Sequence, residues 1–278
     1  MNKVKELFGI YCSENANISE VLNTQICPYS HKKCFKTRKS APTTSIGTCT
    51  VSYQDRNIII CPHRLLENNQ VFIDCLHLLT LHEPGNELYI VPEVSIPGGS
   101  VDYFLVSAKK GVVKDFCGIE FQTMDTTGTV WPERQRLLAS LGFKTDSRDT
   151  ENEKSFGMNW KMTAKTILIQ MHHKAETFEY LNKHLALIIQ KPFFEYMKKE
   201  FSFSHIQGIR IGDTVHIHSY DFLDESKFFK LSLDSRVSTD TNGIAKALGL
   251  QAQAKVELND ILAIIEKKLT KENRLTIV

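Results

Sequence analysis

The sequence predicts an α/β (α+β) fold, in which helices flank a mixed sheet and a small lobe precedes it. Three strand patterns follow one another between residues 86 and 124, and the longest helical pattern comes after them, over 159–184. The first 66 residues are rich in Ser, Thr, Lys and Cys and show little periodicity. We therefore expect an N-terminal lobe, residues 1–68, and a core domain, residues 69–278, which a chain of 278 residues is long enough to form.

The N-terminal lobe offers few secondary-structure signals. Residues 37–48 have the composition of a loop, and residues 56–63 are typical of one short strand. The segment contains several cysteines and few large apolar residues, so it would hardly fold around a hydrophobic core of its own. Something else is expected to hold it together.

The core domain shows clearer patterns. Residues 86–95, 99–110 and 112–124 predict three strands of an antiparallel meander, because the turn sequences EPGN, IPGG and KKG precede or separate them. In the long helix, apolar side chains recur at helical spacing and predict one buried face: Ala164, Ile167, Leu168, Met171, Ala175, Phe178 and Leu181. The other expected elements are a short helix or buried segment (69–80), a helix (132–142), a strand (185–190), a helix (192–201), a hairpin (205–222) and a last helix (260–271).

Composition and charge narrow the class of protein. Hydrophobic residues make up 42% and charged residues 24% of the chain, which is ordinary for a globular protein. No apolar run is long enough to cross a membrane and no signal peptide is recognisable, so a cytoplasmic location with reduced cysteines is expected. The whole chain carries a net charge of +2, but residues 1–64 contain nine Lys or Arg and four Asp or Glu. This local excess suits an anionic partner, although a solvated surface would show it too.

Acidic side chains recur on the three expected strands. Asp102 lies on the second strand, and Glu120 and Gln122 point to one face of the third. Because adjacent strands are about 4.8 Å apart, Asp102 and Glu120 would bring two carboxylates together, with Glu93 of the first strand as a third. Clustered carboxylates repel unless a cation lies between them, and Mg²⁺ is the usual one. Acids at solvated strand ends are the alternative.

At these residues the chain resembles a known family. An Asp on one strand and Glu-x-(Lys or Gln) on the next resembles the nuclease core written PD-(D/E)XK. The stretches IPGGSVDYFLVSAKKGVVKDFCGIEFQTMDTTGTVWPERQ and GMNWKMTAKTILIQMHHKAETFE resemble restriction endonucleases of the NotI and EagI type, over about residues 25–200. Gln122 stands where the wider pattern has Lys, a replacement that also occurs in some restriction enzymes.

The resemblance implies a type II restriction endonuclease with a PD-(D/E)XK core. Such an enzyme hydrolyses double-stranded DNA with Mg²⁺ and leaves 5′-phosphate ends. Asp102 and Glu120 would ligate the ion, and Gln122 would orient the attacking water and contact the phosphate. A homodimer acting on a palindromic site is expected, since each strand needs its own active site. A DNA repair nuclease with the same core, or a DNA-binding protein without catalysis, are the alternatives.

The long helix carries cations as well as its apolar face. Lys161 and Lys165 lie one turn apart and would contact DNA phosphates or bases, or form a solvated face. Lys174 is expected on the solvated face of the helix.

Four cysteines of the lobe, Cys27, Cys34, Cys49 and Cys61, form the other candidate site. Their spacing lacks the C-x2-C pairs of common zinc modules, so scattered buried thiols are one interpretation and a structural Zn or Fe site is the other. The resemblance implies iron held by these four. Cys12 is an alternative ligand, and Cys75 and Cys117 are expected in the core. The cations flanking this segment are expected on DNA phosphates: Lys32, Lys33, Lys36, Arg38 and Lys39.

Overall fold

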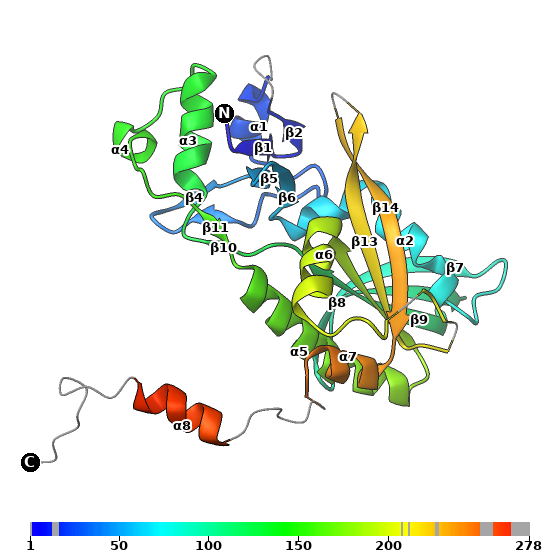
Figure 1. The fold of residues 1–278 in the computed structure, drawn as a ribbon. Coiled ribbons are helices and arrows are strands. Elements are labelled where there is room, and N and C mark those ends of the chain that lie inside the picture. The colour runs from blue at the N-terminus through cyan, green and yellow to red at the C-terminus, as the bar shows by residue number, and fades with distance from the viewer. Residues whose placement is uncertain are drawn as a thin grey trace, which may run out of the picture.

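A computed structural model of the protein describes residues 2–267, apart from 13–16, 207, 211, 226–227 and 251–257 (Figure 1). Its central feature is a six-stranded mixed sheet in the order β14-β13-β12-β9-β8-β7. The strands are β7 (Glu87–Ile96), β8 (Gly99–Lys109), β9 (Val112–Gln122), β12 (His184–Gln190), β13 (Val215–Glu225) and β14 (Phe228–Thr239). The prediction of an α+β fold with a mixed sheet and flanking helices is confirmed.

Both kinds of strand pairing occur in this sheet. Strands β7, β8 and β9 form the expected antiparallel meander, whereas β9 and β12, and β12 and β13, are parallel. Parallel neighbours need crossover connections. These are supplied by α3 (Trp131–Ser140), α4 (Ser147–Thr150) and α5 (Trp160–Tyr180) between β9 and β12, and by α6 (Lys191–Glu200) between β12 and β13.

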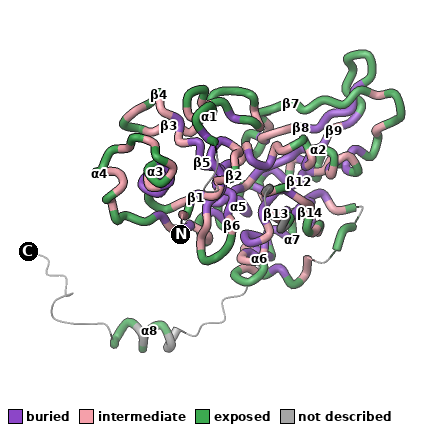
Figure 2. Tube along the Cα trace, turned by 90° about the horizontal axis from the view of Figure 1, so that it is seen from above, coloured by how far each residue is buried: buried purple, intermediate pink, exposed green. Residues whose placement is uncertain are grey.

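Helices cover both faces of the sheet, because alternate side chains of each strand point to opposite sides. On one face, Phe104 and Leu187 belong to the same apolar cluster as Ile167 of α5, with α6 and α7 (Thr241–Ala247) alongside. On the other face, Ile188 clusters with Phe72. The elements on that face are η1 (Pro62–Asn69), α2 (Gln70–Asp74) and η2 (Leu76–Leu78). Buried residues run through the middle strands, while edge strand β7 is exposed along most of its length (Figure 2).

Helix α5 lies close against β9, and a glycine makes this approach achievable. The six apolar residues predicted for the buried face from Ala164 to Phe178 are buried, but Leu181 is 47% exposed because the helix ends at Tyr180. Under the helix, a Cβ at Gly118 would lie 2.4 Å from Phe178 Cζ and 2.9 Å from Leu185 Cδ1.

Replacing Gly118 by Ala should therefore destabilise the protein. Overpacking a core typically costs about 1–3 kcal/mol. Each kcal/mol lowers Tm by about 2–4 °C in a protein of this size class. The measurement is a thermal melt beside Gly212→Ala, whose added methyl group would meet no atom within 4 Å. Equal melting temperatures for the two variants would contradict the packing argument.

The N-terminal lobe contains more structure than its sequence indicates. Residues 37–48 are not a loop, since β3 (Thr37–Arg38) and β4 (Ala41–Ser45) occupy most of them and β5 (Thr48–Tyr53) begins at the last. The lobe does contain apolar residues in a core, but it shares that core with the rest of the chain: Val4, Leu7 and Ile18 are fully buried and cluster with Leu137 and Leu138 of α3. Its elements are β1 (Val4–Leu7), β2 (Ile10–Tyr11), α1 (Ser19–Thr24), β3 (Thr37–Arg38), β4 (Ala41–Ser45), β5 (Thr48–Tyr53) and β6 (Arg56–Ile59), with a sheet in the order β2-β1-β5-β6.

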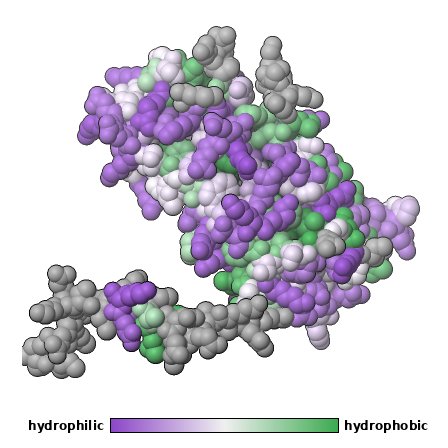
Figure 3. Space-filling view, viewed as in Figure 1, coloured by the Kyte–Doolittle hydropathy of each residue, from purple (hydrophilic) through white to green (hydrophobic). Residues whose placement is uncertain are grey.

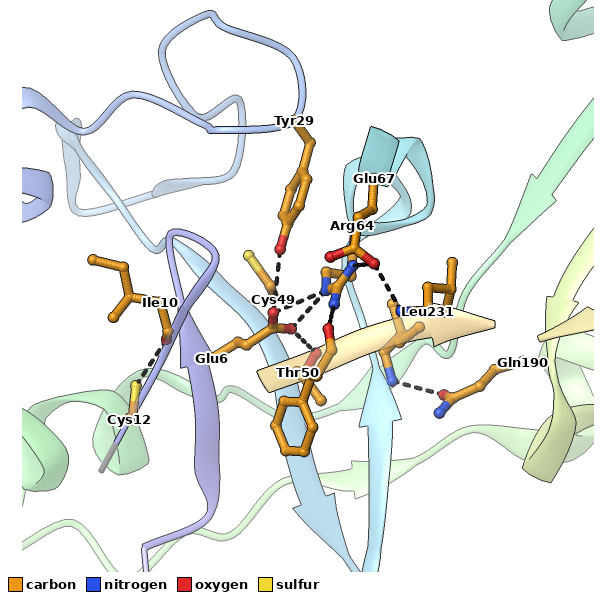
Figure 4. A network of polar contacts seen from close by, with 12 residues as sticks. Glu6, Ile10, Cys12, Tyr29, Cys49, Thr50, Arg64, Glu67, Gln190 and Leu231 are labelled. Carbon is orange, nitrogen blue, oxygen red and sulfur yellow. Dashed lines mark hydrogen bonds and ion pairs between the residues drawn. The ribbon is translucent and has the colours of Figure 1, made fainter. Parts of the chain in front are cut away.

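A buried ionic network joins this lobe to the central sheet (Figure 4). Arg64 Nε lies 2.9 Å from both carboxylate oxygens of Glu6, and the two residues are 0% and 2% exposed. The same guanidinium donates to Phe229 O of β14, and Leu231 N of β14 donates to Glu67 at 2.7 Å. Charges this deeply buried must be paired, so the network fixes β1, η1 and β14 relative to one another.

The C-terminal half contains one correction. The segment 205–222 is not a hairpin, because β13 starts only at Val215 and pairs with β14, a strand that the sequence analysis missed. The last described helix, α8 (Leu258–Glu266), overlaps the expected one, whose residues 268–271 lie outside the described part. A short two-stranded sheet pairs β10 (Thr126–Thr127) with β11 (Gly157–Met158).

The described surface is mixed in character. The face shown in Figure 3 carries hydrophilic side chains interspersed with smaller hydrophobic areas. None of the described helices is long and apolar enough to cross a membrane.

Candidate functional site

Three acidic residues lie in a row across three neighbouring strands. Strands β8 and β9 pair Tyr103 with Ile119 at the end of their ladder, and the next residue of each strand is Asp102 and Glu120, which lie close enough for the Asp102 charge to act on Glu120. Strands β7 and β8 are in register on both sides of Glu93, which sets it opposite Asp102. Glu93, Asp102 and Glu120 therefore follow one another across the three strands, although their side chains do not gather closely enough within the described ranges to form a three-residue metal site.

The two inner carboxylates, Asp102 and Glu120, are largely shielded from solvent. Glu120 is 4% exposed, and burial, followed by the nearby Asp102 charge, raises its pKa to about 7. Burial also raises the pKa of Asp102, and the charge of Glu93 adds to this, while Asp102 Oδ2 accepts a hydrogen bond from Phe121 N at 2.8 Å. Glu93 is exposed and has a left-handed backbone with φ of 52°. Such a group of acids favours binding of a positive charge.

A lysine that the sequence analysis placed in solvent lies at this site. Lys174 of α5 is buried, and its Nζ lies 2.7 Å from Glu120 Oε1. The prediction of a solvated Lys174 is thus wrong. The signal was present in the sequence: Lys174 is three residues after Met171 and four before Phe178, and both are on the buried face.

Gln122 shares the sheet face of Glu120, as expected for residues two apart in a strand. It is half-buried, and its Nε2 donates to Thr123 O at 2.6 Å. The parallel strand β12 sets Leu187 and Ile189 beside Glu120 and Gln122. The Gln122 amide therefore lies at the Glu120 end of the row of acids, next to the apolar strand β12.

Lys161 and Lys165 are not brought to the carboxylates. Lys165 and Lys174 are nine residues apart, which is two and a half helical turns, so they point to opposite sides of α5. Both Lys161 and Lys165 are exposed and border a hollow with Phe201, Ser202 and Gly249. If they contact DNA, they do so away from the row of acids.

The four cysteines of the lobe are neighbours. All four are buried free thiols. A hydrogen bond from Cys49 lowers the pKa of Cys61 to about 6, whereas the pKa of Cys49 is raised by the same contact and by burial. Burial chiefly, then the nearby Cys61 and Cys27, raises the pKa of Cys34. Within the described ranges, however, no three or more His, Cys, Asp or Glu side chains gather closely enough to hold a metal ion.

The remaining cysteines lie elsewhere. Cys12 Sγ is 3.5 Å from Ile10 O, and burial raises its pKa to about 12. Cys75 and Cys117, the latter on β9, are fully buried in the apolar cluster on one face of the central sheet, which confirms that they are core residues. His63, which the sequence analysis did not single out, lies beside Cys27, and this neighbour raises the pKa of the imidazole.

The cations around Cys34 divide into two groups. Arg38 and Lys36 are engaged within the protein: Arg38 makes two 3.0 Å contacts with Asp149, and Lys36 donates to Ile60 O. Lys32, Lys33 and Lys39 are exposed, although Lys33 also donates to Thr43 O at 3.1 Å.

A comparison with known protein families gives a match. The sequence model of a family described as Restriction endonuclease NotI matches residues 16–221, which is more than half of the chain. No curated protein matches it. The matched segment includes the row of acids, Gln122, Lys174 and the four cysteines of the lobe.

Proposed function

The chain belongs to the NotI restriction endonuclease family, and we propose that it is a type II enzyme that hydrolyses duplex DNA at a defined site and leaves 5′-phosphate ends. The observation that carries the proposal is the row of Glu93, Asp102 and Glu120 across β7, β8 and β9. A PD-(D/E)XK core is supported by the same strands, because an Asp on one strand and Glu-x-Gln on the next meet in a mixed sheet beneath a helix.

Mg²⁺ is the proposed catalytic ion, with Asp102 and Glu120 as its protein ligands. Two facing carboxylates with raised pKa values form an oxygen donor set that suits a hard divalent cation. When bound, Mg²⁺ would polarise the scissile phosphate and activate a water molecule. Gln122 would hold that water and contact the phosphate through its amide, which carries no charge.

A structural Fe or Zn ion held by Cys27, Cys34, Cys49 and Cys61 is proposed for the N-terminal lobe, residues 1–68. Four buried thiols of one lobe, two of them (Cys27 and Cys61) with lowered pKa values, are a soft donor set suited to such metals. The lobe shares a small apolar core with α3, so the metal would stiffen it rather than replace a core. The lobe would contact DNA phosphates through its cations, and exposed Lys32, Lys33 and Lys39 are the most accessible of them.

A homodimer that cuts both strands of a palindromic site is the proposed active form. Incubation of a supercoiled plasmid of known sequence with the protein and Mg²⁺ should give linear DNA whose ends all map to one sequence and ligate again without added phosphate. Light scattering should show the mass of two chains in solution or on DNA.

Three other outcomes would each reject part of this proposal. A persistent monomer that only nicks DNA would exclude the dimer. Scattered ends would favour a repair-type nuclease with the same core. Tight DNA binding without cleavage would indicate a DNA-binding protein that has lost catalysis.

A further inference from the structure

The strand that carries Glu120 has no lysine at the position where the wider nuclease pattern has one, since Gln122 stands there. A positive charge nevertheless reaches Glu120 from another part of the chain. Lys174 Nζ lies 2.7 Å from Glu120 Oε1, and the two side chains are 6% and 5% exposed. This ammonium comes from α5, more than fifty residues further along the chain.

The β7–β8 turn is fitted closely around this lysine. A Cβ at Gly98 would lie 2.6 Å from His173 O, and a Cβ at Gly99 would lie 3.3 Å from Lys174 Cε. Thr177 Oγ1 donates to Pro97 O at 2.7 Å and holds the turn against the helix. The side chain of Lys174 is thus enclosed by helix, turn and strand, which limits its ammonium to the neighbourhood of Glu120.

A second ion pair involving β9, between Asp115 and the half-buried Lys183 that precedes β12, shows what an ordinary ion pair looks like here. Lys183 Nζ lies 2.5 Å from Asp115 Oδ1, and this carboxylate also accepts backbone hydrogen bonds from Leu81 and Phe116. Glu120 instead lies close to a second carboxylate, Asp102. At Asp115, one ammonium faces one carboxylate, so the charges balance. At Glu120, one ammonium faces two carboxylates, Glu120 and Asp102, so one negative charge is not balanced.

We propose that Lys174 is the catalytic lysine of this site and supplies the positive charge that position 122 lacks. The inference rests on the proposed nuclease function. Because Lys174 is within hydrogen-bond distance of Glu120, a DNA phosphate that approaches Glu120 and Asp102 also approaches the ammonium. Water attacks phosphorus and releases its proton to solvent, and the P–O3′ bond breaks with its electron pair on O3′, which takes a proton from solvent. The Lys174 ammonium stabilises the charge that develops on the phosphate oxygens.

The first test measures DNA binding without metal. Affinity for a duplex oligonucleotide carrying the mapped site is determined in EDTA at several salt concentrations. Lys174→Met should make the slope of log K against log[salt] shallower by about one, because one phosphate contact is lost. Lys183→Met, which breaks the ordinary ion pair, should leave the slope unchanged. Glu120→Gln/Lys174→Met removes both charges, so it tests the same contact without leaving a buried carboxylate unpaired.

The second test moves the lysine. Lys174→Met should slow cleavage at saturating Mg²⁺ by about 10²–10³-fold, the usual loss when one charge-stabilising donor is removed. Adding Gln122→Lys to that variant should restore cleavage at least about tenfold, since the charge returns to the same carboxylate. A purely structural role for Lys174 would give no rescue from position 122.

The outcomes separate this inference from the proposed function. A Lys174→Met protein that cuts within about threefold of the wild-type rate, or keeps its salt slope, overturns the assignment of Lys174 alone. A wild-type protein that cuts no DNA with Mg²⁺ overturns the nuclease function instead.

Discussion

Replacing Glu120 by Gln is expected to abolish DNA cleavage, with a loss of at least about 10³-fold, while specific DNA binding persists. A metal ion that stabilises transition-state charge contributes several kcal/mol, and each 1.36 kcal/mol corresponds to a tenfold change in rate. The substitution keeps the size of the side chain and removes only its charge. Asp102→Asn, on the facing strand, is expected to have the same effect.

Stability has to be separated from catalysis in this experiment. Glu120→Gln leaves Lys174 buried without its partner, and breaking a buried ion pair costs about 3–5 kcal/mol. The double variant Glu120→Gln/Lys174→Met removes both charges and should melt closer to wild type. Plasmid cleavage and thermal melts are measured on the same samples. Cleavage near the wild-type rate in folded Glu120→Gln would show that the row of acids is not the active site.

Loss of the cysteine cluster is expected to remove a bound metal and most of the DNA affinity. In wild-type protein purified without added metal, elemental analysis should find about one Fe or Zn per chain, since four thiolates complete one tetrahedral site. Cys49→Ser/Cys61→Ser should contain almost none and should expose the N-terminal lobe to proteolysis, because metal binding of this kind is coupled to folding. A reddish colour would identify iron, while zinc is colourless.

Cys75→Ser provides the matched control for this prediction. It exchanges a fully buried thiol for a hydroxyl outside the lobe, and His218 Nδ1, which lies 3.6 Å from the thiol, offers a hydrogen-bond partner. It should keep the metal. Metal-free wild-type protein, or full metal in the double variant, would refute the site.

The elements that the sequence predicted well are those whose pattern is local. Strands β7, β8 and β9 alternate and are separated by glycine turns, so their limits are correct to within about two residues. The row of acids follows from those three strands, because neighbours in a meander are adjacent in space. The strands of the N-terminal lobe were missed because their apolar residues come in short groups, and their core is completed by Leu137 and Leu138 from a distant helix.

The burial of Lys174 does not follow from its residue type. Lysine is seldom fully buried, so a lysine between helical turns is normally placed in solvent. Its position on the apolar stripe of α5 indicated burial, but only the structure pairs that stripe with Glu120. Likewise, β14, the partner of β13, was missed because the hairpin was expected within residues 205–222, which end before β14 begins at Phe228.

The buried network around Arg64 affects how the chain matures during translation. Two of its hydrogen bonds join residues far apart in the sequence. The bond from Arg64 to Phe229 O spans 165 positions, and the bond from Leu231 N to Glu67 spans 164 positions. At a synthesis rate of about 5–20 residues per second, the second half of the network emerges roughly 10–30 s after the first. Until then a nascent lobe holds a guanidinium that lacks its final acceptor, so the early part of the protein waits for the late part before it reaches its native packing.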